Sequence, residues 1–337
     1  MSSEHLPDYA FAHIDAEDVA VLEAVSNEDG FDVLYRQISS GSYHGQISAA
    51  LYNETLLLKE QHNQSVHFGG TCPLEDYTLA VILDGQPQKT CGNELGLSDL
   101  ILAQPCTSFD FMLQKNVQLG YMQIPQESLH KICSAIGIKL DQLDQYLFRA
   151  NPNLVQQLAQ VMQLALQPIS STDDPAHVQK KSLMTEQQIF GAIINVFSSI
   201  HFYKSEPDPY QSASAKARLA RRVRDCMEAS PDNPLKMLDL CDELNCKLRT
   251  LQHAFSSYFD IAPGTYHRKI RMNEARRTLL RAEPDTTTVT NIANQHGFWH
   301  LGRFALDYKQ LFDESPSQSL AIVKPGPAYT SLRQAMK

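Results

Sequence analysis

Two stretches near the C-terminus decide the fold: LKMLDLCDELNCKLRTLQHAFSSYF at residues 235–259 and TTTVTNIANQHGFWHLGRFALDYKQLF at residues 286–312. In each, a short amphipathic segment precedes a three-residue turn, at 245–247 or 296–298, and a longer amphipathic segment follows. A turn of this length between two helices is typical of a helix-turn-helix. Residues 266–281 place apolar side chains at helical spacing, so they are expected to form a helix that joins the two units.

The sequence between residues 43 and 124 consists of short β-rich pieces separated by Asn, Gly, Pro, Asp and Gln. The pieces are QISAALYN, ETLLLKE, SVHFGG, YTLAVILDG, SDLILAQP, SFDFMLQ and NVQLGYMQI. They predict a small antiparallel barrel or sandwich. Helical periodicity then predicts helices at 126–138, 140–149, 153–166 and 184–202. The last two have broad apolar faces, which either pack onto the barrel or mediate self-association.

The fold class that follows is α+β, with a boundary in the stretch KSEPDPYQSASAK. This stretch combines acids, prolines and small residues, as linkers do. Residues 1–204 are expected to form a β-rich, cupin-like barrel with flanking helices. Residues 205–215 are the expected linker, and residues 216–320 an all-α domain with two helix-turn-helix units. Residues 321–337 are expected to be a C-terminal tail.

Composition excludes several classes of protein. The chain has 337 residues, of which 43% are hydrophobic and 20% charged, and this composition fits a globular protein with a sizeable core. No run reaches the roughly 18 to 20 apolar residues of a membrane span. The acidic start, MSSEHLPDYAFAHIDAED, lacks the features of a secretory signal. Seven scattered cysteines without a CxxC pair favour a reducing, cytoplasmic location.

The charge is unevenly distributed along the chain. Residues 1–210 contain 10 Lys and Arg against 25 Asp and Glu, whereas residues 211–320 contain 16 against 13. The formal net charge of the whole chain is −9. This division suggests that only the back half meets a polyanion, although a small excess of base is also within ordinary scatter.

The back half resembles the DNA-binding domain of the AraC/XylS family of bacterial transcription regulators. The matching segments are RTLQHAF, YHRKIRMNEARRTLL, TVTNIANQHGF, FALDYKQLF and the pair Ser315-Pro316, in the family's order over about residues 238–317. WHLGRFALDYKQLF with LDLCDEL upstream is most similar to the subgroup that includes the ethanolamine-utilisation regulators. The resemblance implies a transcription regulator, more specifically an activator, that binds double-stranded DNA. It also implies that the protein forms a homodimer and contacts RNA polymerase. It implies neither catalysis nor a cofactor, and no membrane attachment.

The second helix of each unit is expected to enter the major groove. In the first unit, Arg can read guanine and Gln adenine, while Lys and Thr suit phosphates. The expected DNA contacts are Lys247, Arg249, Thr250, Gln252, His253 and Ser256, followed in the second unit by Trp299, His300, Arg303 and Lys309. Trp299 is the one tryptophan of the chain, and it either touches the groove edge or fills the core beside Phe298.

The sequence departs from the family pattern at four positions. Lys247 stands where a helix-capping Ser is usual, so the cap or the turn must differ. Asp260 and Asp313 replace the Gly that usually follows each recognition helix, and Asp tolerates a left-handed backbone better than most residues. Leu306 replaces an Arg that is common in the second recognition helix, which puts base contacts of that helix in more doubt.

The sequence shows no residue pattern typical of a catalytic or metal site. The barrel histidines lack the His-x-His and Glu spacing of an iron or manganese site, so they are expected to be surface or hydrogen-bonded residues: His44, His62 and His67. Four cysteines also lack the spacing of a zinc site: Cys72, Cys91, Cys106 and Cys133. There is no Gly-rich phosphate loop and no nucleophile elbow. The chain is therefore expected not to be an enzyme.

Two hypotheses remain for the front half. In the first, which the resemblance favours, it is an effector-sensing and dimerising domain with a small molecule inside the barrel. In the second, it docks a protein partner or only dimerises. Aromatic residues of the strands are the candidates for a ligand pocket, although such residues more often belong to a core: Tyr43, Tyr52, Phe68, Phe111 and Tyr121. The sequence does not identify the effector. The subgroup resemblance suggests ethanolamine-related compounds, with cobalamin as a second effector.

Overall fold

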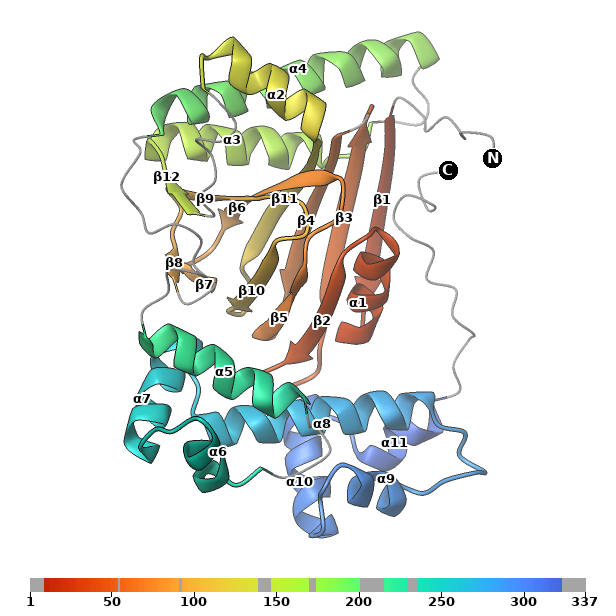
Figure 1. Cartoon of the computed structure of the whole chain (residues 1–337). Helices are drawn as coiled ribbons and strands as arrows, with labels where there is room; N and C mark the ends of the chain where they lie inside the picture. The colour runs from red at the N-terminus through yellow and green to blue at the C-terminus, as the bar shows by residue number, and fades with distance from the viewer. Residues whose placement is uncertain are drawn as a thin grey trace.

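The computed structural model describes residues 9–53, 55–90, 93–138, 147–169, 174–200, 215–229 and 235–322. A β-sandwich with flanking helices forms the upper part of Figure 1, and a layer of helices lies beneath it. This arrangement confirms the β-rich front half and the helical back half.

The sandwich consists of two antiparallel sheets. The first has seven strands in the order β1 (Tyr9–Ala16), β3 (Gly45–Tyr52), β4 (Thr55–His62), β11 (Gln118–Pro125), β6 (Asp76–Asp84), β9 (Asp99–Ala103) and β12 (Leu147–Arg149). The second has five, in the order β2 (Asp32–Gln37), β5 (Val66–Thr71), β10 (Ser108–Leu113), β7 (Gln88–Thr90) and β8 (Asn93–Leu95). Apolar side chains of both sheets form one core between them.

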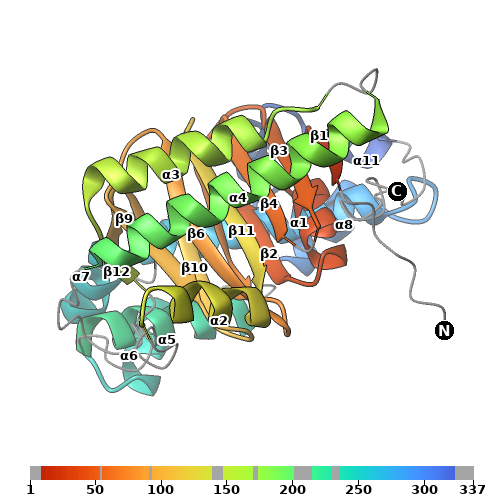
Figure 2. The same cartoon turned by 90° about the horizontal axis from the view of Figure 1, so that it is seen from above.

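Helices cover the outer face of the seven-stranded sheet. They are α2 (Gln126–Ala135), α3 (Pro152–Ala165) and α4 (Pro175–Ser199), and Figure 2 shows them lying across the strands. Both faces of this sheet are therefore buried. On β4, Leu56 and Leu58 pack between the sheets while Leu57 packs under the helices, as the alternation of side chains along a strand requires. Helix α1 (Val19–Glu28) closes the sandwich between β1 and β2.

The helical layer contains α5 (Ala215–Ala229), α6 (Met237–Glu243), α7 (Leu248–Phe259), α8 (Pro263–Arg281), α9 (Val289–Gln295), α10 (Leu301–Phe312) and α11 (Pro316–Ala321). Helix α8 runs beneath the sandwich and joins the two helix-turn-helix units (Figure 1). Apolar side chains at helical spacing along α8 are fully buried: Tyr266, Ile270, Ala275 and Leu279.

Several predictions need correction. Residues 147–149 of the helix predicted at 140–149 form strand β12, because pairing with the edge of β9 outweighs local periodicity. The rest of that segment, up to residue 146, lies outside the described residues. The sequence analysis also missed β1, α1, β2, β7 and β8, and α4 begins nine residues before the predicted start at 184. Residues 205–214 of the expected linker and 323–337 of the expected tail lie outside the described residues.

Candidate functional site

The first helix-turn-helix unit consists of α6 and α7. Its turn is tightened by Asn245, whose φ is +48°, and by the hydrogen bond from the Cys246 N–H to the Cys241 carbonyl at 2.9 Å. Leu251 and Phe255 of α7 are fully buried, as their spacing predicts. Lys247 occupies the N-cap without a side-chain hydrogen bond to the helix, so the usual cap is missing here.

The outer face of α7 holds the side chains predicted to meet DNA. Five of them are exposed: Lys247, Arg249, Thr250, Gln252 and His253. Ser256, one turn further on, is half-buried. Donors and acceptors at the exposed positions can reach base edges or phosphates if α7 lies in a major groove.

The second unit consists of α9 and α10. Thr288 caps α9 by accepting a hydrogen bond from the Asn291 N–H at 3.2 Å. Phe298, Phe304 and Tyr308 are buried and belong to the apolar core of this unit. Trp299 is 68% exposed, so it does not fill the core.

The outer face of α10 differs in its chemistry from that of α7. His300, Arg303 and Lys309 are exposed. The Nε of Arg303 lies 3.0 Å from an Asp307 carboxylate oxygen, so part of its guanidinium is already engaged within the helix. Leu306, which stands in place of a common Arg, is 69% exposed and has no polar group to offer a base.

The two recognition helices end in the same way. Asp260 and Asp313 adopt left-handed backbones with φ of +55° and +61°. Each N–H closes the last turn, on the Ser256 or Lys309 carbonyl respectively. Asp therefore replaces the usual Gly without loss of the turn, as the sequence predicts.

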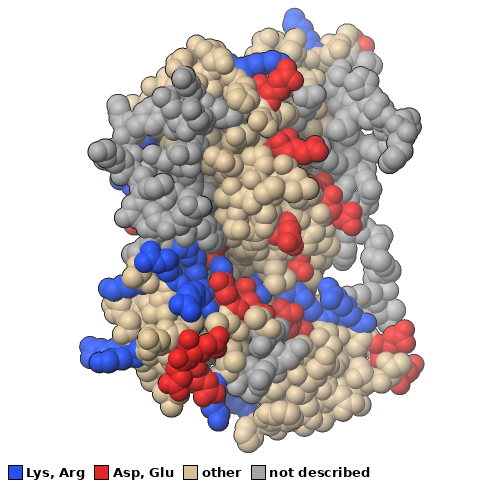
Figure 3. Space-filling view, in the orientation of Figure 1, with Lys and Arg blue, Asp and Glu red and all other residues tan. Residues whose placement is uncertain are grey.

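Most of the arginines of α8 are committed to packing within the protein. Arg271 lies over the ring of Phe298 at 4.5 Å, and Arg276 lies over Phe312 at 4.7 Å. Arg276 also pairs with Asp18 of the sandwich at 2.6 Å. The positive charge available to a polyanion consequently lies on other surfaces of the helical layer, and Figure 3 shows Lys and Arg there beside a patch of Asp and Glu.

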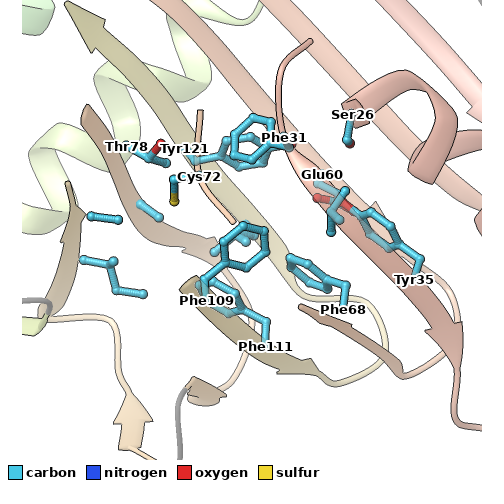
Figure 4. A pocket seen from close by; sticks show the side chains of 15 residues that line it. Ser26, Phe31, Tyr35, Glu60, Phe68, Cys72, Thr78, Phe109, Phe111 and Tyr121 are labelled. Atoms are coloured by element: carbon cyan, nitrogen blue, oxygen red, sulfur yellow. The ribbon is translucent and has the colours of Figure 1, made fainter. Parts of the chain in front are cut away.

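A second candidate site is a cavity between the two sheets. Its wall is largely aromatic and contains Phe31, Tyr35, Phe68, Phe109, Phe111 and Tyr121 (Figure 4). Phe68, Phe111 and Tyr121 were predicted to line a pocket from the sequence, and they do line this cavity.

Two predicted pocket residues lie elsewhere. Tyr52 faces the helices, and its hydroxyl donates to the Ala165 carbonyl at 2.7 Å, so it does not line this cavity. Tyr43 lies outside the lining and contacts Nδ1 of His62 at 2.6 Å through its hydroxyl. The wrong face was assigned to Tyr52 because both faces of its strand are apolar.

Sequence reasoning missed the one carboxylate in the cavity. Glu60 is 0% exposed and lies on β4. The available signal was its spacing, since Leu56, Leu58, Glu60 and His62 alternate along one strand and share a face.

The cavity is connected to the helical layer through β2. The ring of Tyr35 lines the cavity, while its backbone N–H donates to Glu23 at 3.0 Å and its carbonyl accepts from Arg277 of α8. Arg277 and Glu23 are themselves 2.7 Å apart. The same residue of the chain therefore contacts both the cavity and a helix of the helical layer.

The next residues of β2 extend this connection. Asn273 of α8 accepts from the Gln37 N–H at 2.9 Å and donates to the Gln37 carbonyl at 3.0 Å, as a neighbouring strand would. Arg36 pairs with Glu228 of α5 at 2.9 Å. Side chains of α5 and α8 thus take the hydrogen-bonding positions along this edge of the sheet.

A buried polar cluster joins the same two layers. His67 contacts Asp110 at 2.9 Å and the Tyr266 hydroxyl at 3.0 Å, and Asp110 also pairs with Arg224 of α5. Burial opposes ionisation of Asp110, but the neighbouring charges of His67 and Arg224 outweigh it and lower the pKa of that carboxyl. His62 and His67 therefore have polar partners, as expected, and His44 is partly exposed.

The described part of the chain contains no group of three or more His, Cys, Asp or Glu side chains arranged to hold a metal ion. Within the same ranges, no helix combines the length and apolar character needed to cross a bilayer.

Comparison with known proteins supports the assignment of the back half. A helix-turn-helix domain family matches residues 240–321. The probable thc operon regulatory protein of Rhodococcus erythropolis is 34% identical over 191 residues, covering 56% of this chain. The match spans only about half of that relative, 53% of its length. XylDLEGF operon transcriptional activator 1 of Pseudomonas putida is 25% identical over 261 residues, 74% of this chain and 75% of that protein.

Similarity to solved structures is weaker over the whole chain. The crystal structure of the AraC-like transcriptional activator CuxR covers 79% of this chain and 96% of that one, with 11% identity and a TM-score of 0.41. The assignment therefore depends on the domain match and on the relatives by sequence, which are transcription regulators. Residues 240–321 of this chain thus match a helix-turn-helix domain family, and the relatives that the chain resembles by sequence are transcription regulators.

Proposed function

We propose that this chain is a sequence-specific transcription activator whose sandwich senses a small molecule. In this proposal residues 216–320 bind double-stranded DNA, and residues 1–204 form a cupin-like sensing and dimerising domain joined to them by a linker at 205–215. The observation that supports sensing most directly is Tyr35, because it lines the cavity and its backbone is hydrogen-bonded to α8.

DNA recognition is proposed for the outer faces of α7 and α10. Two recognition helices on one face of a duplex enter successive major-groove segments about 34 Å apart. Arg249 and Gln252 are the proposed base readers, because both are exposed and both side chains can form paired hydrogen bonds to a base. The remaining contacts are proposed to be to phosphates and groove edges: Lys247, Thr250, His253, Ser256, Trp299, His300, Arg303 and Lys309.

Coupling between the two sites is proposed to run through β2 and α8. A ligand that shifts the Tyr35 ring also shifts the backbone carbonyl that accepts from Arg277. Arg277 lies on the helix that joins the two helix-turn-helix units, so its displacement alters how the units present their outer faces. Binding of DNA and of the effector would then influence each other's affinity by the same factor.

A matched pair of variants tests this coupling. Thermal unfolding against small amines, fatty acids, aromatic acids and cobalamins first selects a compound that stabilises the full chain. The affinity for a selected DNA site is then measured with and without that compound. We expect Arg277→Ala to abolish the response to the compound, and Arg281→Ala, an exposed residue of the same helix, to preserve it. Equal responses in the two variants would contradict the route through Arg277.

The other partners follow from the same proposal. Leu164, Leu183 and Met184 are exposed apolar residues on α3 and α4, and they support a homodimer contact on this outer layer. RNA polymerase is the proposed protein partner of an activator. Ethanolamine-related compounds belong in the ligand panel because the sequences of α10 and α6 resemble those of the ethanolamine-utilisation regulators.

A further inference from the structure

The cavity between the sheets has a distinctive charge. Glu60 is the one acidic residue among the fifteen that line it, and none of the fifteen is Lys or Arg. An anionic ligand would therefore meet a buried carboxylate and no cation in the wall. A cationic ligand would find an opposite charge inside a low-dielectric space, where such pairing is strongest.

The carboxylate of Glu60 retains unused hydrogen-bonding capacity. One of its oxygens lies 2.9 Å from Nε2 of His62, and the Tyr35 and Tyr121 hydroxyls also interact with the carboxylate, but neither oxygen makes a well-aligned hydrogen bond among the described residues. A carboxylate has about four acceptor positions, and leaving them unpaired in a dry interior is costly. Figure 4 shows Glu60 between Tyr35, Phe68 and the rings of Phe31 and Tyr121. The carboxylate therefore belongs to the wall of the space that a ligand would occupy, with His62 beside one of its oxygens.

The groups around Glu60 do not cancel its charge on the cavity side. His62 contacts one carboxylate oxygen from outside the cavity lining and uses its other ring nitrogen on the Tyr43 hydroxyl. Burial, assisted by the negative charge of Glu60, raises the pKa of Tyr35 and of Tyr121 well above the usual value. Asp29 adds a second negative charge near Tyr121. The two phenols thus stay neutral at physiological pH and can orient toward a ligand without repelling it.

The walls favour the same class of ligand as the charge does. Aromatic faces attract organic cations through their quadrupoles, and such rings recur in sites for ammonium ligands. Tyr35 stacks on Phe68 with ring centroids 4.9 Å apart, and Phe68 stacks on Phe111 at 5.2 Å. These rings form a continuous apolar wall beside the carboxylate.

We infer that the cavity selects a small organic cation, an amine or amidine with an apolar body, whose positive end pairs with Glu60. This inference rests on the proposed sensing function and adds the chemical class of the effector. The volume of the cavity, about 40 Å³, is room for about three water-sized groups. Compact cations therefore fit first, and a ligand with a ring requires Phe31 or Phe109 to move.

Pairs of molecules that share a shape and differ in charge test the inference. Acetamidine is matched with acetate, and benzamidine with benzoate and neutral benzamide. The full chain is unfolded thermally with each compound, and affinities are measured by calorimetry. We expect at least one amidine to raise Tm by about 5 °C at 100 times its Kd, and to bind at least about tenfold more tightly than its carboxylate partner. A carboxylate that stabilises the chain as much as its amidine partner would overturn the inference.

Two variants locate the effect. Glu60→Gln keeps the shape of the side chain and removes its charge, so we expect it to lose the preference for amidines and to accept benzamide at least as well. Ala103→Leu keeps Glu60 and fills the cavity, so we expect it to abolish the change in Tm with every compound. This variant tests the binding site even if Glu60→Gln does not fold. An amidine shift that survives both substitutions would place the binding site elsewhere and refute the inference.

The outcomes also separate this inference from the proposed function. Stabilisation by carboxylates or fatty acids, with a change in DNA affinity, would preserve sensing and refute the cationic class. A panel in which no compound of either charge changes Tm or DNA affinity would refute both.

Discussion

The two helix-turn-helix units share a local design and differ in what supports them. The apolar core of the first unit includes Ile38 and Met112 of the sandwich together with residues of α5 and α7. Among the described residues, the core of the second unit contains only side chains from Met272 onward. The core of the first unit is therefore continuous with the sandwich, whereas the second unit contacts the sandwich mainly through polar groups, such as the Gln37 amide that donates to the Leu311 carbonyl at 2.7 Å.

The outer faces of the two units also differ, in whether their polar side chains are already bound to other residues of the protein. Arg249 and Gln252 of the first unit have no side-chain partner among the described residues and are free to bind a base. Arg303 of the second unit is held by Asp307, which also pairs with Arg268 of α8. We therefore expect sequence reading to belong mainly to the first unit, whose core also includes side chains of the sandwich.

The largest expected effect comes from breaking the two cores separately. Phe255→Ala and Phe304→Ala each remove a ring that is at most 1% exposed, so each should lower the free energy of unfolding by about 3–5 kcal/mol. Hydrogen exchange should distinguish them, because the first substitution should also loosen β2 and β10 while the second should leave the sandwich protected. If both variants exposed the same amides, the two units would not differ in their support.

Acid should loosen both units together through α8. Burial, and then the positive charge of Arg271, lowers the pKa of His267 from 6.5 to about 4. In the unfolded chain the His267 ring therefore binds a proton below about pH 6.5, whereas in the folded chain it does so only below about pH 4. The free energy of unfolding should therefore fall as the pH drops through this range. We expect a loss on the order of 2 kcal/mol by denaturant unfolding at pH 7 and pH 4.5.

The control for this effect is His267→Gln, which cannot take up the proton and should flatten the profile between pH 6.5 and 4. Asp110 does not affect this comparison. Its pKa is lowered in the folded chain, so its contribution to the free energy of unfolding changes in more acidic solutions. An unchanged slope in the variant would assign the acid sensitivity to another group.

The sequence predicted the helix-turn-helix units well because their signals are local. A three-residue turn and the stripe that includes Leu251 and Phe255 specify the motif within about 25 residues. The central strands were also recognisable from their β-rich pieces. Strands β7 and β8 have three residues each, too few for any periodicity to appear.

Other features depend on contacts between distant segments and could not be read from the sequence. In the stretch ETLLLKEQH, Glu60 looks like a solvent-exposed charge near the end of a strand. It is buried because the second sheet packs over that strand. Arg276 and Arg277 contribute to a basic helix that suggests phosphate binding, yet they pair with Asp18 and Glu23 of the sandwich. A sequence shows the charge of such residues, whereas their partners depend on the assembled fold.

Base reading should be sensitive to α7. Arg249→Ala or Gln252→Ala should cost about 1–3 kcal/mol of binding to the specific site and relax the preference for it over random DNA. Arg303→Ala should cost less discrimination, because its guanidinium is already shared with Asp307. Competition binding at fixed salt measures all three variants. Full discrimination in both α7 variants, or a larger loss in Arg303→Ala, would reverse the assignment of roles to the two units.

The smallest expected effect concerns Lys309 of α10, which is exposed near the end of the helix. Its proposed partner is a phosphate, which carries no sequence information, so Lys309→Ala should weaken binding to specific and random DNA alike. The plot of the logarithm of the binding constant against the logarithm of salt concentration should become shallower by about 1. A loss confined to one sequence would show that Lys309 reads a base, and the second unit would then share in recognition instead of only anchoring the first.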